Sequence, residues 1–180
     1  ALKVIKDSDL CLFVVDAKSG LTTKDIELAD YLRKSGVMTR TIVNKCESGP
    51  SSYNIFEFFE LGFGEPIAIS AEHNIGIGIL IEQILEAVPS NLINEENDFD
   101  AINLAIIGKP NVGKSTLLNS LIGHERMLTG DIAGITRDSI SSDWEWCGKK
   151  IKLIDTAGIR RKSKVYKDTE KLAYFDSIKT

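Results

Sequence analysis

The sequence predicts an α/β fold in which a parallel-rich sheet is covered by helices on both faces. Short apolar runs of strand length each end in a polar residue, as buried parallel strands do. Segments of helical character alternate with these runs. The chain has 180 residues, 43% hydrophobic and 27% charged, a composition that excludes disordered, collagen-like and coiled-coil classes. No apolar run approaches the roughly 20 residues that span a bilayer, so we expect no membrane segment.

The first half of the chain predicts three strands alternating with three helices. Apolar runs place the strands at 10–15, 39–43 and 66–69. The first helix follows Thr22 or Thr23 as its N-cap and stops near Gly36. The other two helices are expected at 53–61 and at 75–88, the last one ended by Pro89.

An acidic polar segment at 90–100 predicts a linker, which divides the chain into units 1–89 and 101–180. The second unit predicts a strand at 103–107, a loop at 108–115 and a helix at 114–122, with Gly123 just past its end. Two further strands, 140–146 and 150–155, turn at Cys147-Gly148, and a last helix is expected at 168–178.

Charge and cysteine content narrow the function classes. Residues 1–100 carry 8 basic and 17 acidic side chains, a net of −9, whereas residues 148–180 carry 10 and 4, a net of +6. The basic stretch is either an anion or nucleic-acid contact or a solvated lysine-rich surface. The three cysteines lie far apart without a C-x-x-C pair, which argues against disulfides and zinc and for a reducing compartment. Because the first residue is Ala1, we expect a fragment, and nothing indicates secretion.

The strongest motif is the segment 108–115, which reads GKPNVGKS and fits G-x-x-x-x-G-K-[ST] between a predicted strand and a predicted helix. Its glycines allow backbone N–H groups to surround phosphates, and the helix N-terminus adds a positive dipole. Lys114 can reach the β- and γ-phosphates, and the Ser115 hydroxyl can bind magnesium. The phosphate-binding residues expected here are Gly108, Lys109, Pro110, Asn111, Val112, Gly113, Lys114 and Ser115.

Two later segments fit the same nucleotide site. Asp155, at the end of an apolar strand in Asp155-Thr156-Ala157-Gly158, can hold magnesium through water. The Gly158 amide can meet a γ-phosphate. Thr136 lies in a loop containing glycine, where its hydroxyl either ligates magnesium when γ-phosphate is present or simply caps a helix or loop.

A pattern typical of segments that read a nucleotide base precedes the segment 108–115, which is called the P-loop below. Asn44-Lys45-Cys46-Glu47 follows a strand and resembles the guanine-reading N-K-x-D. Its acidic side chain accepts hydrogen bonds from the ring N–H and the amino group of guanine, a donor pair that adenine lacks. Glu47 is one methylene longer than Asp, so its position must shift. Ser70-Ala71-Glu72 resembles the S-A-K loop that backs the base, and Cys46 fits a small buried hydrophobe.

Taken together, the segments 108–116, 131–138 and 155–162, extended by 14–16 and 44–45, resemble the EngA/Der family of bacterial tandem-domain GTPases. The resemblance implies P-loop NTPase (Ras-like GTPase) halves: the C-terminal half of a first GTPase domain, a linker, and the N-terminal half of a second. It also implies GTP hydrolysis with magnesium, often helped by potassium, in a cytoplasmic protein that acts on the 50S ribosomal subunit and its rRNA late in assembly.

The resemblance extends the site to further residues. Lys114, Thr136 and Gly158 are implied as catalytic, Asn111 as the residue supporting potassium, and Ser115, Thr136 and Asp155 as magnesium ligands. Ile159 stands where Ras-like proteins place a glutamine that orients water, which implies slow intrinsic hydrolysis. The implied phosphate contacts also include Thr116, Asp155, Thr156, Ala157, Gly158 and Ile159, and the implied guanine contacts are Asn44, Lys45, Glu47, Ser70 and Ala71.

Three readings of the isolated chain stay open. If the two halves remain apart, the base reader and the P-loop belong to different sites and neither site is complete. The order of base reader, P-loop and then switches is also that of circularly permuted GTPases, so the halves could close into one domain. Third, the chain could bind phosphate or RNA without turnover, with contacts from the basic segment 160–164.

Overall fold

The computed structural model describes residues 5–49, 52–87, 102–129, 143–146 and 149–153. Strands and helices alternate along these residues, as the sequence predicts. They are β1 (Leu10–Asp16), α2 (Thr23–Ser35), β2 (Thr39–Asn44), the 3-10 helix η2 (Ile55–Leu61), β3 (Ile67–Ala68), α3 (Ile77–Glu86), β4 (Ile102–Ile107), α4 (Lys114–Thr129), β5 (Asp143–Trp146) and β6 (Lys149–Leu153).

All six strands form one sheet in the order β3-β2-β1-β4-β6-β5. Every neighbouring pair is parallel except the β5–β6 hairpin. The α/β class with a parallel-rich sheet is therefore confirmed. The central pair joins strands from the two halves of the chain, because β1 lies beside β4 with Leu10 opposite Leu104 and Phe13 opposite Ile107. The backbone N–H of Asp9 donates to the carbonyl of Asn103 at 2.8 Å, and this bond extends the contact by one residue.

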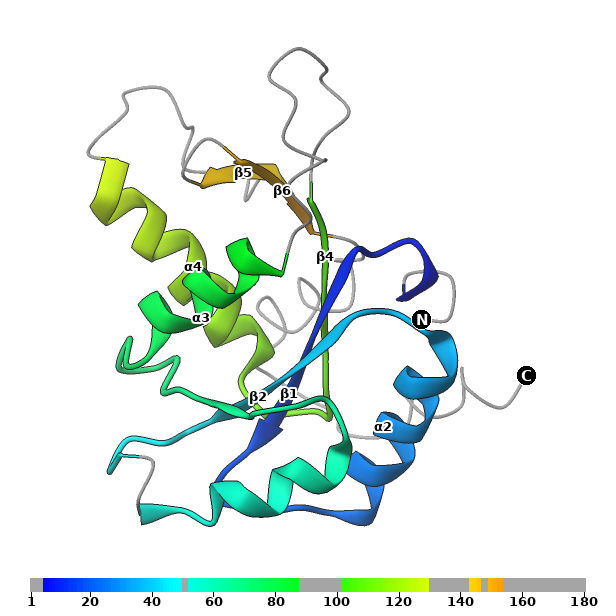
Figure 1. Cartoon of the computed structure of the whole chain (residues 1–180). Coiled ribbons are helices and arrows are strands. Elements are labelled where there is room, and N and C mark those ends of the chain that lie inside the picture. Colours follow the sequence, from blue (N-terminus) through cyan, green and yellow to red (C-terminus); the bar gives the residue numbers. More distant parts are fainter. Residues whose placement is uncertain (1–4, 50–51, 88–101, 130–142, 147–148, 154–180) are drawn as a thin grey trace, which may run out of the picture.

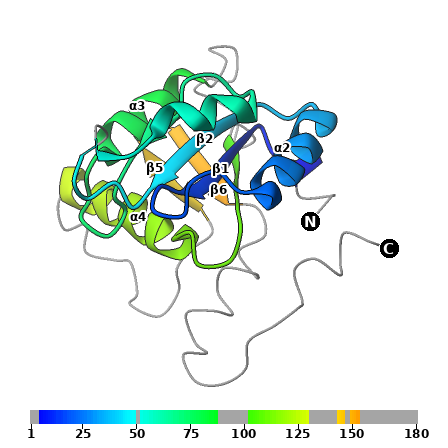
Figure 2. The same ribbon diagram turned by 90° about the horizontal axis from the view of Figure 1, so that it is seen from below.

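Helices cover both faces of this sheet, with α3 and α4 on one side of β1 and β4 and α2 on the other (Figures 1 and 2). All seven residues of β1 are buried, and alternate side chains enter different cores. Leu12 packs in the cluster that includes Leu80 of α3 and Leu117 of α4. Phe13 packs in the cluster that includes Leu32 of α2 and Phe58 of η2. The first of these cores therefore unites side chains from both halves of the chain.

Local signals set the ends of α2 as predicted. The backbone N–H of Thr22 donates to the Asp25 carboxylate at 3.1 Å, which holds the first turn. Gly36 adopts φ 73° after the last turn, a left-handed conformation that glycine takes without steric cost.

Other helix ends differ from the prediction. Helix α4 continues to Thr129 instead of stopping at 122, because the run 125–128 (Glu, Arg, Met, Leu) consists of good helix formers that outweigh the glycine penalty of about 1 kcal/mol. Helix α3 begins only at Ile77, because the backbone of Ile75 forms a pair of 3.0 Å hydrogen bonds with Ser70. The segment at 55–61 is a 3-10 helix, and its buried residues Phe58 and Leu61 are spaced by its three-residue turn.

Several predictions fall outside the described residues: the linker at 90–100, the strand residues 140–142, the last residues of the 150–155 strand and the helix at 168–178. The division of the chain into halves of two different domains stays a prediction. Among the described helices, none combines the length and apolar character needed to cross a bilayer.

Candidate nucleotide-binding site

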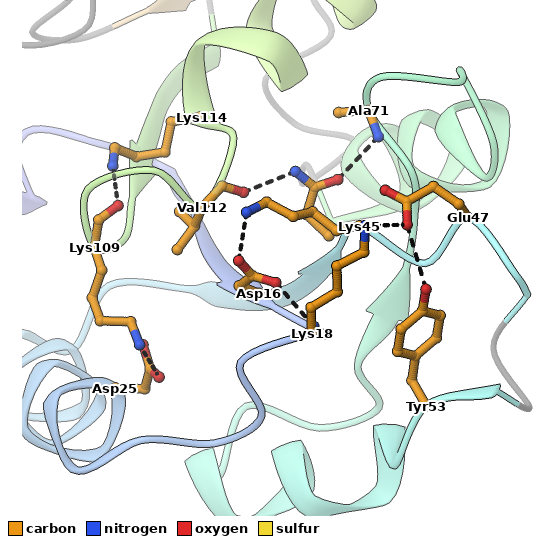
Figure 3. A network of polar contacts seen from close by, with 11 residues as sticks. Asp16, Lys18, Asp25, Lys45, Glu47, Tyr53, Ala71, Lys109, Val112 and Lys114 are labelled. Carbon is orange, nitrogen blue, oxygen red and sulfur yellow. Dashed lines mark hydrogen bonds and ion pairs between the residues drawn. The ribbon is translucent and has the colours of Figure 1, made fainter.

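The P-loop connects β4 to α4, as its sequence predicts. Positive φ angles at Gly108 (153°), Asn111 (66°) and Gly113 (94°) turn the backbone around the loop. Lys114 opens α4, and its ammonium donates to the carbonyl oxygens of Gly108 at 2.8 Å and Lys109 at 2.5 Å (Figure 3). The amine therefore lies across the loop, and Ser115 and Thr116 follow it in the first turn of the helix. This is the arrangement that binds phosphate at a helix N-terminus.

The P-loop packs directly against the first half of the chain. A Cβ at Gly108 would collide with the backbone carbonyl of Val14 in β1, and one at Gly113 would collide with the Asn44 side-chain amide. Both glycines also have φ angles that other residues rarely adopt. Glycine is required here because the loop and the strand ends of the other half approach each other too closely for a side chain.

Asn44 links the P-loop to the loop at 70–72, which is predicted to back the base. Its Nδ2 donates to the carbonyl of Val112 at 2.8 Å, and its Oδ1 accepts from the Ala71 backbone N–H at 3.0 Å (Figure 3). The side chain is only 3% exposed, so both polar atoms need these partners. A single amide therefore fixes the distance between the P-loop and the loop at 70–72, although the first contact spans 68 residues of sequence.

Asp16, at the end of β1, organises two lysines beside Asn44. Its Oδ2 accepts from Lys45 Nζ at 2.5 Å, and its Oδ1 accepts from the backbone N–H of Lys18 at 2.9 Å. Lys45 has a φ of 73°, a left-handed conformation that turns the chain sharply after β2. The predicted Lys45 therefore lies at the site, held by a carboxylate.

Two residues that belong to no sequence motif hold the Glu47 side chain. Lys18 Nζ lies 2.9 Å from Glu47 Oε2, and the Tyr53 hydroxyl donates to the same oxygen at 3.4 Å (Figure 3). The hydrogen bond from Lys18 is the main cause that lowers the pKa of Glu47, so its carboxylate is ionised at neutral pH. The only sequence signal for Lys18 was its place two residues after a strand end, at the edge where Asn44 also lies.

An ion pair that no motif predicts joins the P-loop to α2. Lys109 Nζ lies 2.8 Å from Asp25 Oδ2 and donates to Thr22 Oγ1 at 2.7 Å. The Asp25 side chain is fully buried, and its other oxygen has no hydrogen-bond partner among the described residues. The role of Lys109 as a phosphate contact stays a prediction. Its side chain neutralises a buried carboxylate of the other half.

The structure therefore brings together most of the predicted residues that it describes: the P-loop with Lys114, Asn44, Lys45, Glu47 and Ala71. Ser70 is fully buried beside Ala71, and its hydroxyl has no partner among the described atoms. The segments 131–138 and 155–162, which correspond to the two switch segments of GTPases in the resemblance, lie outside the described ranges. The roles of their residues therefore stay predictions: Thr136, Asp155, Thr156, Ala157, Gly158 and Ile159.

The chain is similar to known GTPases. Residues 103–179 match the family model described as a 50S ribosome-binding GTPase. GTPase Der of Bartonella tribocorum is 44% identical over 97% of this chain, and GTPase Der of Polaromonas naphthalenivorans is 45% identical over 99%. The chain spans only 43% and 40% of the lengths of those two proteins. The solved structure of YjeQ from Thermotoga maritima superposes with a TM-score of 0.47 at 18% identity, over 85% of this chain and 50% of that one.

Proposed function

Because the chain belongs to the GTPase Der family, we propose that it binds GTP and GDP and hydrolyses GTP at one site built from both of its halves. The observation that carries this proposal is the Asn44 amide, which contacts the P-loop through Val112 and the base loop through Ala71. A nucleotide whose phosphates lie on the P-loop would have its base next to residues 44–47 and 70–72. The proposal is therefore the circularly permuted arrangement of the two halves.

Guanine is the base that this site favours. The Glu47 carboxylate can accept from the ring N–H and the amino group of guanine, whereas adenine presents no such pair. Lys45 is held by Asp16 beside the same segment. Adenine turns the lone pair of its ring N1 toward the carboxylate where guanine turns an N–H, so the pair of hydrogen bonds is lost, which penalises ATP. We expect GTP and GDP to bind in preference to adenine nucleotides.

Hydrolysis at this site depends mainly on charge stabilisation. Lys114 would leave the carbonyl oxygens of Gly108 and Lys109 for the β- and γ-phosphates. Hydroxyl oxygen suits a hard cation, and the Ser115 hydroxyl lies at the helix start where the phosphates would end. Magnesium would be held there by Ser115 with Thr136 and Asp155, and it would neutralise charge on the phosphates. Asn111, exposed at the top of the loop, is the proposed support for potassium.

The other proposed contributions come from the switch segments. Thr136 and the Gly158 amide would contact the γ-phosphate, and Ile159 cannot orient water by hydrogen bonding, so turnover would be slow. We propose a cytoplasmic role with the 50S ribosomal subunit and its rRNA in late assembly. The family that matches residues 103–179 is described as a ribosome-binding GTPase, and the basic residues Arg160, Arg161, Lys162 and Lys164 supply charge for an RNA contact.

The test is equilibrium binding of fluorescent GTP and ATP, with magnesium, to the chain and to its Lys114→Ala and Asn44→Ala variants. Selective GTP binding that both substitutions abolish supports a single site. The matched control is Asn119→Ala, which removes an exposed amide from α4. Weak binding that ignores the base and is lost only with Lys114→Ala would instead place the base reader and the P-loop in separate sites. Tight GTP binding without turnover would identify a non-hydrolysing remnant.

A further inference from the structure

Glu47 stands in an unusual electrostatic setting for a residue that reads a base. Its carboxylate stands on a side chain one methylene longer than that of aspartate. The carboxylate of Glu72 lies close by. Ligand atoms of Glu47, Glu72 and His73 all lie within 4.8 Å of one another. Two carboxylates at such a distance repel each other, and a glutamate has one more rotatable bond through which to move away. Something other than the backbone must hold the Glu47 carboxylate in place.

Lys18 is the residue placed to do this. Its Nζ lies 2.9 Å from Glu47 Oε2, on an oxygen that also accepts from the Tyr53 hydroxyl. Its own backbone is anchored, because its N–H donates to Asp16, the same carboxylate that holds Lys45. Figure 3 shows Lys18, Asp16 and Lys45 grouped around the base-reading segment. Lys18 thus comes from the loop after β1, whereas Glu47 comes from the loop after β2.

We propose that Lys18 is a positioning residue that sets guanine specificity by holding the Glu47 carboxylate where it accepts both guanine N–H groups. This inference rests on the proposed function and names a determinant of that same site. The Lys18 side chain is 57% exposed, so its ion pair adds little to folding stability. Its effect appears only when a base is bound, because a carboxylate that is free to rotate makes one good bond to guanine instead of two.

Inosine diphosphate (IDP) isolates this second bond. Its base, hypoxanthine, keeps the ring N–H of guanine and lacks the amino group. The experiment measures Kd for GDP, IDP and ADP on the full chain, with Lys18→Met, Lys18→Arg and Glu47→Asp variants. We expect Lys18→Met to reduce the preference for GDP over IDP by roughly tenfold, the contribution of one charge-assisted hydrogen bond, while Kd for IDP changes little. Lys18→Arg should retain the preference for GDP over IDP because it keeps the positive charge.

The matched control is Lys34→Met, which removes an exposed lysine from the end of α2. If the effect came only from a general loss of positive charge, both lysine variants would bind GDP, IDP and ADP more weakly to the same extent. In the Glu47→Asp chain the shorter carboxylate cannot reach Lys18 in the same way, so adding Lys18→Met there should leave the GDP-to-IDP ratio unchanged.

The outcomes separate this inference from the proposed function. An unchanged ratio in Lys18→Met, or equal weakening of GDP and IDP, overturns the role of Lys18 while guanine binding by the parent chain stands. A parent chain that does not prefer GDP over ADP overturns both proposals.

Discussion

At the scale of single residues, Cys46 lies between two positions proposed to read the base, yet its thiol is buried. Burial raises the pKa of Cys46 to about 11 and that of Cys11, in the centre of β1, to about 12. The thiolate is the reactive form, so both thiols stay protonated and inert near neutral pH. Cys46 therefore packs as a small hydrophobic residue in the core cluster that contains Leu32 of α2 and Phe58 of η2, as its sequence context predicts.

We expect a Cys147→Ser chain to show no rapidly reacting thiol at pH 8, and two after denaturation. Because both pKa values are raised, reactivity of the folded chain should increase only as the pH approaches 11. Titration with a thiol reagent, with and without denaturant, measures this. Fast labelling of one thiol in the folded chain would mean that Cys46 is accessible from the nucleotide site.

The buried Asp25 carboxylate gives a second prediction at this scale. Lys109→Met removes its ion-pair partner, whose side chain is 15% exposed, and leaves a fully buried charge. We expect the free energy of unfolding to fall by about 3 kcal/mol, as for other broken buried pairs. Urea denaturation measures it. Removing the exposed partner of Arg33 with Asp30→Ala is the control and should change stability by less than about 0.5 kcal/mol. Equal effects would show that Asp25 is solvated.

At the scale of elements, the P-loop and the helix that follows it differ in their tolerance of side chains. Gly113→Ala places a Cβ against the Asn44 amide at a φ of 94°, so we expect a loss of about 1–3 kcal/mol in stability and loss of GTP binding. Gly123→Ala, within α4, has open space around it and should stabilise the chain by about 1 kcal/mol. Thermal unfolding and nucleotide titration of both variants provide the measurement. Normal GTP binding by Gly113→Ala would contradict the contact with Asn44.

Elements were predictable where their signals are local. The apolar run of β1 and the cap residues of α2 lie within the segments that they define, and both elements appear where expected. The start of α3 was wrong because Ile75 pairs with Ser70 across a turn, and the end of α4 was wrong because one glycine did not stop the helix. The P-loop was predictable because its motif and its strand–helix context lie in one continuous segment.

At the scale of the whole molecule, the sequence allowed the two halves to pack together, but it did not predict the contacts between them. The order of the motifs along the chain is the signal that left a permuted arrangement open. The ion pair between Lys109 and Asp25 and the hydrogen bond from Asn44 to Val112 connect residues far apart in the sequence. Such contacts depend on side-chain positions that only the packed sheet defines. Lys18 was missed for the same reason, since no motif pairs it with Glu47.

If the halves share one core, they unfold together. Leu80 of α3 is fully buried in the cluster that also contains Leu104 and Leu117 from the other half. We expect Leu80→Ala to lower the free energy of unfolding by about 2–5 kcal/mol. The midpoint of unfolding followed by tryptophan fluorescence should fall as well, although both tryptophans belong to β5 in the other half of the chain. Circular dichroism should give the same midpoint. A fluorescence transition that ignores Leu80→Ala would show two independent units.

The pairing of β1 with β4 has one further consequence. A strand has two edges, and β1 uses one for β2 and the other for β4. The hydrogen bonds that close one chain on itself are therefore the same bonds that would join β1 of one molecule to β4 of another. Pairing of β1 with β4 of a second molecule competes with pairing inside one chain. The connection at 88–101 holds the two halves of one chain at an effective concentration on the order of millimolar. At protein concentrations below that value pairing inside one chain is favoured, so dilution keeps the proposed nucleotide site within a single molecule.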